Sequence, residues 1–272
     1  MNFSIAFNLE PYLEFEDGKL TKDGCKMAIL AVSTIREFGG RYKDNDIFFV
    51  NANNKEIPAF IKEELQKLNC IFIDEKPIWP NLPEKIDVRY LNKIYGYSLI
   101  EKKIPGNILY LDIDIVCRDL ENFIRFMPKN KIILTEYSIE MEVFKKVTYF
   151  FKKMSKILNL NRTYNPLGCF YFSRNSNLFN LLKEETERLL KNDKFIQHCS
   201  TFMLSDEVVM ASLLSQNKGI DFKFISSVKF SKYIYHYSDL QKLKYFLFSD
   251  HIYLSKQSYF LKEITKKLNI FV

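Results

Sequence analysis

Residues 107–120 read NILYLDIDIVCRDL, in which an apolar run passes directly into two acids, Asp112 and Asp114, before apolar residues resume. This pattern predicts a buried strand over residues 107–114. Because residues two apart on a strand face the same side, we expect the two carboxylates to share one side and Ile113 to turn into the core. The stretch therefore places an acid pair at the carboxyl end of a buried strand.

Strands and helices alternate along the chain on both sides of this stretch. Strands are predicted at residues 3–7, 46–50, 70–73, 131–137 and 168–173, and helices at 25–38, 57–68, 88–103, 139–158, 176–192 and 205–215. Repeated strand–helix–strand units imply a parallel sheet with helices on both faces. We therefore expect an α/β fold with a mostly parallel central sheet, followed by a smaller and less regular C-terminal part.

A divalent cation would explain why two acids lie at the end of a buried strand. Ligands of open α/β sheets bind outside the carboxyl ends of the strands. Two buried carboxylates side by side repel, so either one is protonated or both face a cation, and oxygen ligands suit Mg²⁺ or Mn²⁺. The alternative is that Asp112 and Asp114 only begin a loop and cap the next helix. A second pair, Asp44 and Asp46, precedes its strand and is interpreted as a solvated turn at the amino edge of the sheet.

Composition limits the class of protein. The 272 residues suit one large domain, or one domain with a small appendage, and the five cysteines never form a CxxC pair, which favours reduced thiols in a cytoplasm. The net charge of +7 fits either a merely basic protein or one with an acidic partner such as a nucleotide, a phosphate or anionic lipid. Nucleic acid is not expected as a partner, because lysine is spread along the chain. The sequence contains no apolar run that would span a bilayer, and its first residues lack the basic start of a signal peptide.

The stretch at residues 107–120 resembles the metal-binding DxD segment of GT-A fold glycosyltransferases, and its nearest likeness is family 8, many of whose members build bacterial lipopolysaccharide. Four further segments resemble that family in order: LNKIYGYSLIE with Asn92 and Lys93, YNPLGCFYFS with Asn165 and Gly168, LSDEVVMASLL with Asp206 and Glu207, and IYHYSDLQKLK with His236 and Lys242. The chain departs from the family pattern in the last segment, which lacks a glycine and a Pro-Trp pair, and in the first strand.

The resemblance implies roles for these residues. Asp112, Asp114 and His236 would hold the metal, and Asp206 and Glu207 would be catalytic. The donor nucleotide-sugar would be bound by Asn92, Lys93, Asp112, Asn165, Gly168 and Lys242. Simpler interpretations stay open: close packing for Gly168, a helix cap for Asp206, and ordinary surface positions for His236 and Lys93. In an inverting enzyme Asp206 or Glu207 would be the general base, whereas in a retaining enzyme the same acid would hold donor sugar hydroxyls.

The resemblance also implies a function. We expect a metal-dependent hexosyltransferase, using Mn²⁺ or Mg²⁺, that moves a sugar from a nucleotide-diphosphate sugar, in the first place a UDP-sugar, to a glycan or lipid-linked glycan in surface polysaccharide or lipooligosaccharide synthesis. Residues 1–215 would form the catalytic core. Residues 216–272 would complete the metal and diphosphate site and either contact an anionic membrane from the cytoplasm or pack as a terminal helix. The alternatives are a sugar nucleotidyltransferase and a non-catalytic binding protein of the same fold.

Overall fold

The computed structural model of the protein describes residues 2–9, 22–53, 56–79, 82, 86, 88–136, 142–160, 164, 166–198, 204–216, 219–236 and 256–269. The strands are β1 (Ser4–Asn8), β2 (Ile47–Asn51), β3 (Cys70–Asp74), β4 (Asn107–Leu111), β5 (Ile115–Cys117), β6 (Ile132–Glu136), β7 (Pro166–Arg174), β8 (Phe222–Ser226) and β9 (Ile234–His236). The helices are α1 (Lys22–Phe38), η2 (Gly40–Tyr42), α2 (Ala59–Lys67), α3 (Val88–Lys103), α4 (Leu120–Arg125), α5 (Glu142–Leu158), α6 (Leu178–Leu190), α7 (Asp193–His198), α8 (Asp206–Ser215), α9 (Ser227–Ser231) and α11 (Lys256–Lys267).

Seven strands form one sheet in the order β3-β2-β1-β4-β7-β6-β8, and β5 and β9 form a separate two-stranded sheet. Within the large sheet β7 alone is antiparallel to its neighbours β4 and β6. The remaining strand pairs are parallel. β4 therefore lies in the interior of the sheet between β1 and β7, and its carboxyl end opens where ligands of α/β sheets bind. The predicted mostly parallel sheet is confirmed.

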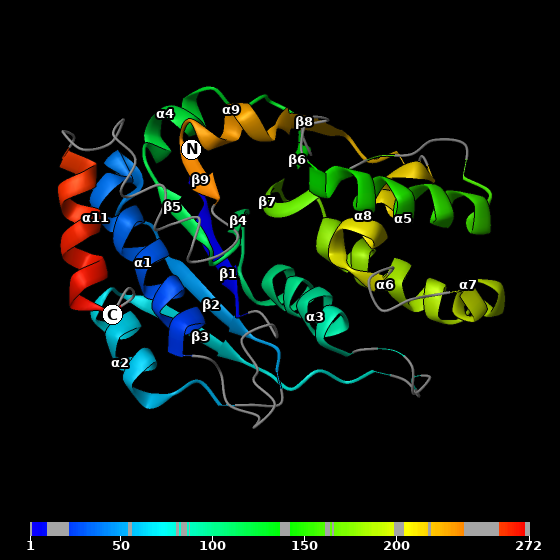
Figure 1. The fold of residues 1–272 in the computed structure, drawn as a ribbon, viewed down its shortest axis with the longest axis horizontal. Helices are drawn as coiled ribbons and strands as arrows, with labels where there is room; N and C mark the ends of the chain where they lie inside the picture. The colour runs from blue at the N-terminus through cyan, green and yellow to red at the C-terminus, as the bar shows by residue number, and fades with distance from the viewer. Residues whose placement is uncertain are drawn as a thin grey trace.

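Helices cover both faces of this sheet. In Figure 1, α1, α2 and α11 lie on one side of the strands, and α3, α5, α6, α7 and α8 lie on the other. β4 alternates between the two layers, because Leu109 and Leu111 pack into the core beneath α1 and α2, whereas Ile108 and Tyr110 pack into the core beneath α3, α6 and α8. This alternation fixes which helices face each residue that follows the strand.

The strand predicted over residues 107–114 is shorter than expected. β4 ends at Leu111, and the acid pair lies in the bend that leads to β5. Leu111 is the last residue of β4 that pairs with both β1 and β7, so the chain leaves the sheet at Asp112. Ile113 is buried in the core beneath α1, as predicted. The bend allows Asp112 and Asp114 to approach one point without the regular geometry of a strand.

The region after residue 215 contains elements that the sequence pattern did not predict. β8 joins the edge of the large sheet beside β6, and β9 pairs with β5 next to the acid pair. The helix α11 packs on α1 through Leu261, which contacts Leu30 and Val116 in a small apolar cluster. The predicted division of the chain at residues 215 and 216 stays a prediction.

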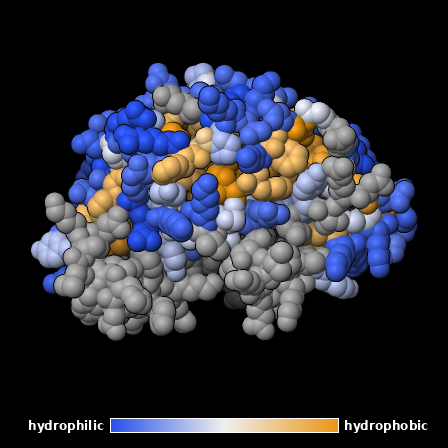
Figure 2. Space-filling view, turned by 90° about the horizontal axis from the view of Figure 1, so that it is seen from above, coloured by the Kyte–Doolittle hydropathy of each residue, from blue (hydrophilic) through white to orange (hydrophobic). Residues whose placement is uncertain are grey.

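The surface carries few large apolar side chains among the described residues. Figure 2 shows the face that bears α4 and α9, where apolar side chains gather in the middle and hydrophilic ones border them. Phe126, directly after α4, is 60% exposed and lies beside the ring of Tyr233. No described helix combines the length and the apolar character that a crossing of the bilayer requires.

A buried carboxylate fixes α8 against α6. Glu185 is 1% exposed and accepts hydrogen bonds from Arg188, from Ser212 at 2.6 Å and from Gln216 at 2.6 Å. Burial alone would raise the pKa of Glu185, but these hydrogen bonds and the charge of Arg188 outweigh it and lower the pKa. Because α8 begins with Asp206, the Glu185 network sets the position of that acid at the other end of the helix.

We predict that Glu185→Gln lowers the free energy of unfolding by about 2 to 3 kcal/mol at pH 7, because the donors lose a charged acceptor. A carboxyl whose pKa is lowered on folding stabilises the protein above its unfolded pKa and stops doing so as the pH falls through its folded pKa. The difference between variant and wild type should therefore shrink in acid. Urea unfolding at pH 7 and pH 3.5 measures it. Glu184→Gln, on the exposed face of the same helix, is the matched control, and equal effects of both substitutions would contradict the prediction.

Candidate active site at the carboxyl end of β4

Three side chains converge where β4 ends. Asp112, Asp114 and His236 offer ligand atoms that all lie within 4.8 Å of one another, and no other group of three or more such side chains gathers among the described residues. The antiparallel pairing of β9 with β5 places His236 opposite Ile115 and so beside the acid pair. His236 Nε2 lies 3.0 Å from Asp114 Oδ2. Two carboxylate oxygens and one imidazole nitrogen are ligands that suit Mn²⁺ or Mg²⁺.

The two acids of the pair have different electrostatic environments. Burial raises the pKa of Asp112 to about 7, with repulsion from Asp114 adding to the rise and attraction to Lys93 opposing it. Burial also acts on Asp114, but attraction to His236 and the hydrogen bond from it hold the pKa of Asp114 below its ordinary value. Two carboxylates that repel each other so strongly favour a cation, which would stabilise the ionised form of both. The residues present therefore fit a divalent metal.

A buried lysine links the acid pair to α8. Lys93 is 4% exposed, and its Nζ lies 3.3 Å from Asp112 Oδ1 and 3.4 Å from Asp206 Oδ2. Asp206, the first residue of α8, is 2% exposed. The Lys93 backbone carbonyl accepts a hydrogen bond from Asn8 at the end of β1, which ties α3 to the same edge of the sheet. One ammonium thus lies between a carboxylate of the metal cluster and a carboxylate of α8.

Three tyrosines surround these two carboxylates. The Tyr110 hydroxyl donates to Asp112 Oδ1 at 2.7 Å, and Tyr97 and Tyr171 donate to Asp206 Oδ2 at 2.7 Å and 3.3 Å. Burial, followed by the nearby negative charges, raises the pKa of Tyr97 and of Tyr171 well above the ordinary tyrosine value. Both phenols therefore stay protonated and act as donors.

Glu207 follows Asp206 in the chain and is more exposed than Asp206. It is half-buried, and burial together with the charge of Asp206 raises its pKa to about 8. Gly168 on β7 lies against both acids, since a Cβ at this position would stand 2.4 Å from Asp206 Oδ2 and 3.2 Å from Glu207 Oε1. A glycine at residue 168 is therefore needed for the two carboxyls to approach the strand this closely. A carboxyl whose pKa is raised toward neutral pH, as that of Glu207 is, suits an acid–base role.

The structure brings most of the predicted site residues together, but not all. Asp112, Asp114, His236, Lys93, Gly168, Asp206 and Glu207 lie around the carboxyl end of β4. Asn92 is buried on α3, but none of the hydrogen bonds within the described residues joins it to the acid cluster. Asn165 and Lys242 lie outside the described residues, so their predicted contacts with the donor stay predictions.

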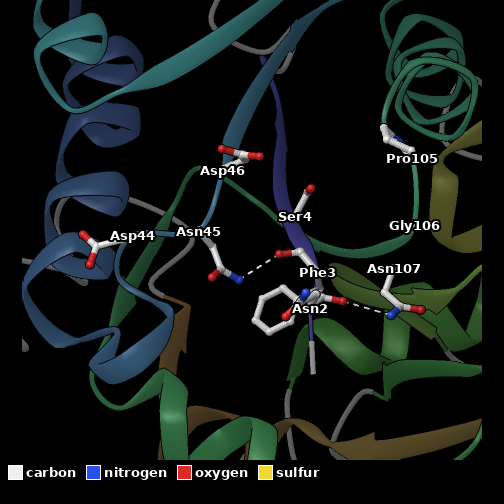
Figure 3. A pocket seen from close by; sticks show the side chains of 9 residues that line it. All are labelled: Asn2, Phe3, Ser4, Asp44, Asn45, Asp46, Pro105, Gly106 and Asn107. Carbon is white, nitrogen blue, oxygen red and sulfur yellow. Dashed lines mark hydrogen bonds between the residues drawn. The ribbon is translucent and has the colours of Figure 1, made fainter.

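The second DxD pair lies at the opposite edge of the sheet. Asp44 and Asp46 are exposed and line a shallow hollow of about 340 Å³ beside the starts of β1 and β4. Figure 3 shows their carboxylates well apart, with Asn45 donating to the backbone carbonyl of Phe3. Position in the fold thus separates the two acid pairs, as the order of strand and acids predicted.

Three residues of the site, Tyr97, Tyr110 and Tyr171, were not predicted from the sequence. Tyr97 lies four residues after Lys93 on α3, which places both side chains on one helix face, and Tyr110 lies two residues before Asp112. These spacings were the available signal, since they put each phenol beside a predicted site residue. Tyr171 gave no such signal, because the antiparallel pairing of β7 with β4 brings it to the site.

No protein-family model matches this chain, and none of the curated proteins matches it either. Several solved structures match the fold of this chain. Mouse xyloside xylosyltransferase 1 is 13% identical with a TM-score of 0.51, over 83% of this chain and 85% of that one. A nucleoside-diphosphate-sugar pyrophosphorylase from Vibrio cholerae RC9 is 11% identical with a TM-score of 0.52, over 90% and 100%. The galactosyltransferase LgtC, in complex with donor and acceptor sugar analogues, is 14% identical with a TM-score of 0.48, over 98% and 95%. At these identities the likeness concerns the fold, and the chain has the α/β fold of GT-A glycosyltransferases.

Proposed function

We propose that this protein is a divalent-metal-dependent glycosyltransferase, similar to family 8, that moves a sugar from a nucleotide-diphosphate sugar to a hydroxyl of a glycan or glycolipid. The observation that carries the proposal is the cluster of Asp112, Asp114 and His236 at the carboxyl end of β4. This edge of an α/β sheet is where such folds bind ligands, and an Asp-Asp-His set is suited to a cation that accompanies a diphosphate. Asp206, at the start of α8, lies close enough to share Lys93 with the cluster, and Glu207 follows it in the chain.

In this reaction the metal and the residues of the site would have separate roles. A bound divalent cation supplies Lewis-acid stabilisation of the negative charge on the departing diphosphate. Asp112, Asp114 and His236 would hold that cation. Asp206 would accept hydrogen bonds from donor sugar hydroxyls, and Lys242 would add positive charge near the diphosphate.

Glu207 is the better candidate for a general base that takes the proton of the acceptor hydroxyl. Its pKa of about 8 makes it a strong proton acceptor near neutral pH, and its half-buried position leaves it reachable. Asp206 suits a fixed binding role instead, because its Oδ2 already accepts from Tyr97 and Tyr171 and lies 3.4 Å from Lys93 Nζ. Its other oxygen would accept from a donor sugar hydroxyl. Glu207 thus suits the base that an inverting enzyme needs, whereas Asp206 suits the holding of donor sugar hydroxyls.

A sugar nucleotidyltransferase is the second candidate, because the Vibrio cholerae pyrophosphorylase shares the fold at a TM-score of 0.52. Such enzymes open with a glycine-rich, basic loop after the first strand, whereas this chain reads NLEPYLEFEDG there. Formation of pyrophosphate from a nucleoside triphosphate and a sugar 1-phosphate would favour the second candidate. Release of a nucleoside diphosphate from a nucleotide-sugar would favour the glycosyltransferase.

We also propose that the acceptor is part of a surface polysaccharide or lipooligosaccharide, and that the protein works in the cytoplasm at the inner face of the membrane. The outer side of α11 supports this placement, since Lys266 and Lys267 are exposed and Tyr259 is 68% exposed. Lysines with an exposed aromatic residue suit an anionic leaflet. Leu261 on the opposite side of α11 is buried, so the helix has a packed side and an outward side.

The metal assignment predicts a loss of donor binding. With Mn²⁺ and a UDP-sugar at about 100 times its dissociation constant, the wild-type protein should gain about 2.7 kcal/mol of stability, by mass action. Asp114→Asn should remove this metal-dependent gain and lower turnover by at least about 100-fold while the protein stays folded. Thermal unfolding with and without EDTA measures the gain across a panel of nucleotide-sugars.

Asp44→Asn is the matched control, because it alters the other DxD pair at the far edge of the sheet and should behave as wild type. The metal assignment is wrong if Asp114→Asn keeps a wild-type response to EDTA. The proposed function is wrong if no nucleotide-sugar stabilises the wild-type protein with Mn²⁺ or Mg²⁺.

The raised pKa of Glu207 predicts a pH dependence. If Glu207 is the base, kcat/KM should rise with pH and level off above about pH 8, and Glu207→Gln should lower kcat/KM by about 100-fold and abolish the rise. The folded protein also retains a proton on Glu207 that the unfolded chain releases above about pH 4.5, so this group destabilises the protein progressively as the pH rises from about 4.5 to 8. In Glu207→Gln that part of the pH dependence of unfolding should disappear. A pH profile identical in variant and wild type would exclude Glu207 as the base.

The outward side of α11 predicts binding to anionic vesicles. The full chain should sediment with vesicles that contain phosphatidylglycerol and not with vesicles of phosphatidylcholine alone, since Lys266 and Lys267 are attracted to anionic head groups. Replacing both lysines by Gln should reduce sedimentation by several fold. Replacing Lys152 and Lys156 on α5 removes the same charge elsewhere and should reduce it less. Equal losses in both double variants would show that only the net charge matters.

A further inference from the structure

Two hydroxyl donors and one ammonium group lie around one oxygen of Asp206. Asp206 Oδ2 accepts from the Tyr97 hydroxyl at 2.7 Å and from the Tyr171 hydroxyl at 3.3 Å, and Lys93 Nζ lies 3.4 Å away. The shortest of these contacts is the one with Tyr97, at the ordinary length of a hydroxyl–carboxylate hydrogen bond. A carboxylate held in this way has its rotation restricted, so its second oxygen is directed by the groups that hold the first.

The Tyr97 ring is itself held in one place. It is fully buried and meets the Tyr110 ring edge-on, with centroids 4.6 Å apart. It stacks on Phe179 at 5.0 Å with an interplanar angle of 17°, and it meets Tyr171 edge-on at 5.6 Å. These partners come from β4, α6 and β7, so three elements of the fold determine where the hydroxyl lies. Because the ring is tightly packed, its hydroxyl has a fixed position. The hydroxyl can therefore hold its acceptor in one orientation.

Lys93 balances the charge of the Asp206 carboxylate but does not fix its orientation. Its Nζ is shared between Asp112 and Asp206 at distances of 3.3 Å and 3.4 Å, and an ammonium on a flexible stem can rotate its three donors among several acceptors. The Tyr97 phenol offers a single donor on a rigid arm. α3 therefore presents, four residues apart, one group that balances the charge of Asp206 and another that orients it.

We propose that Tyr97 is a positioning residue for the sugar-transfer reaction, whose hydroxyl holds the Asp206 carboxylate in the orientation that binds the donor sugar. The proposal rests on the proposed function, because it assigns Tyr97 a task within the same site. Among the described residues the Tyr97 hydroxyl donates to Asp206 and not to Asp112, Asp114 or His236, so its effect on metal binding should be small. Small displacements of a group that orients the reacting sugar are costly, since a shift of about 1 Å can lower the rate by roughly 100-fold.

Tyr97→Phe tests the proposal, because it keeps the ring contacts and removes only the hydroxyl. With a donor that the wild type turns over, kcat and kcat/KM should fall together, by roughly 10- to 100-fold, as expected for an interaction that acts in the transition state. The donor KM should change by less than about threefold. The Mn²⁺ dissociation constant, measured by calorimetry on the free protein, should stay within about twofold, since the metal ligands are untouched.

Two matched variants control for the loss of a buried phenol. The Tyr42 hydroxyl is buried and has no hydrogen-bond partner in the part of the chain that the structure describes. Tyr42→Phe therefore removes the same group without removing such a bond and should keep wild-type kinetics. Tyr171→Phe removes the longer hydrogen bond to Asp206 and should lower kcat less than Tyr97→Phe does. A graded series in the order Tyr97, Tyr171, Tyr42 is the expected result.

A double-mutant cycle gives a readout that does not depend on turnover. The effects of Tyr97→Phe and Asp206→Asn on thermal unfolding should be clearly non-additive if the hydroxyl and the carboxylate interact as described. Additive effects would overturn the proposal. Non-additive effects would also overturn the proposal if Tyr97→Phe kept the wild-type kcat. The contact would then support the fold without orienting Asp206 for the reaction. If the wild-type protein turns over no nucleotide-sugar, both the proposed function and this role of Tyr97 are refuted. That outcome differs from failure of the Tyr97 proposal alone, in which the wild type is active.

Discussion

The site depends on the sharing of one buried ammonium between two buried carboxylates. Lys93 lies between Asp112 and Asp206, and all three residues are buried, with exposed fractions of 4%, 7% and 2%. Burying a charge without a partner is costly, so each of these groups depends on the other two. The fold must therefore bring α3, the end of β4 and the start of α8 to one place, or pay a large desolvation penalty.

The order of strands in the sheet meets this requirement. β4 lies between β1 and β7, and its carboxyl end opens near α3 on one face. β7 runs antiparallel beside β4 and carries Gly168 close to that end. The Glu185 network holds α8 against α6, and α6 packs on α3. The tyrosines fill the space between these elements with rings that pack and hydroxyls that donate. The same set of contacts thus stabilises the layer of helices and arranges the polar groups of the site.

The fold was largely predictable from the sequence, because its main strands are continuous apolar runs and its main helices have helical periodicity. The helix predicted over 88–103 has those bounds in the structure, and the predicted mostly parallel sheet is present. The short elements β5, β9 and α4 were missed, since three to six residues carry too little periodicity to be recognised. The strand over 107–114 was extended too far, because Asp112-Ile113-Asp114 continues the alternation of a strand although its backbone no longer pairs with a neighbour.

The order of residues along the chain is enough to show that Asp112 and Asp114 follow a buried strand and that Asp44 and Asp46 precede one. This was decided by local order along the chain, which fixes the edge of the sheet at which a residue lies. Tertiary structure alone decided which side chains meet there. It brings His236 to Asp114 through the pairing of β9 with β5, and it brings Tyr97, Tyr171 and Lys93 to Asp206 from two different elements. Contacts between residues about 35 to 120 positions apart depend on how sheet and helices close around them, and periodicity records only the neighbours within a few residues.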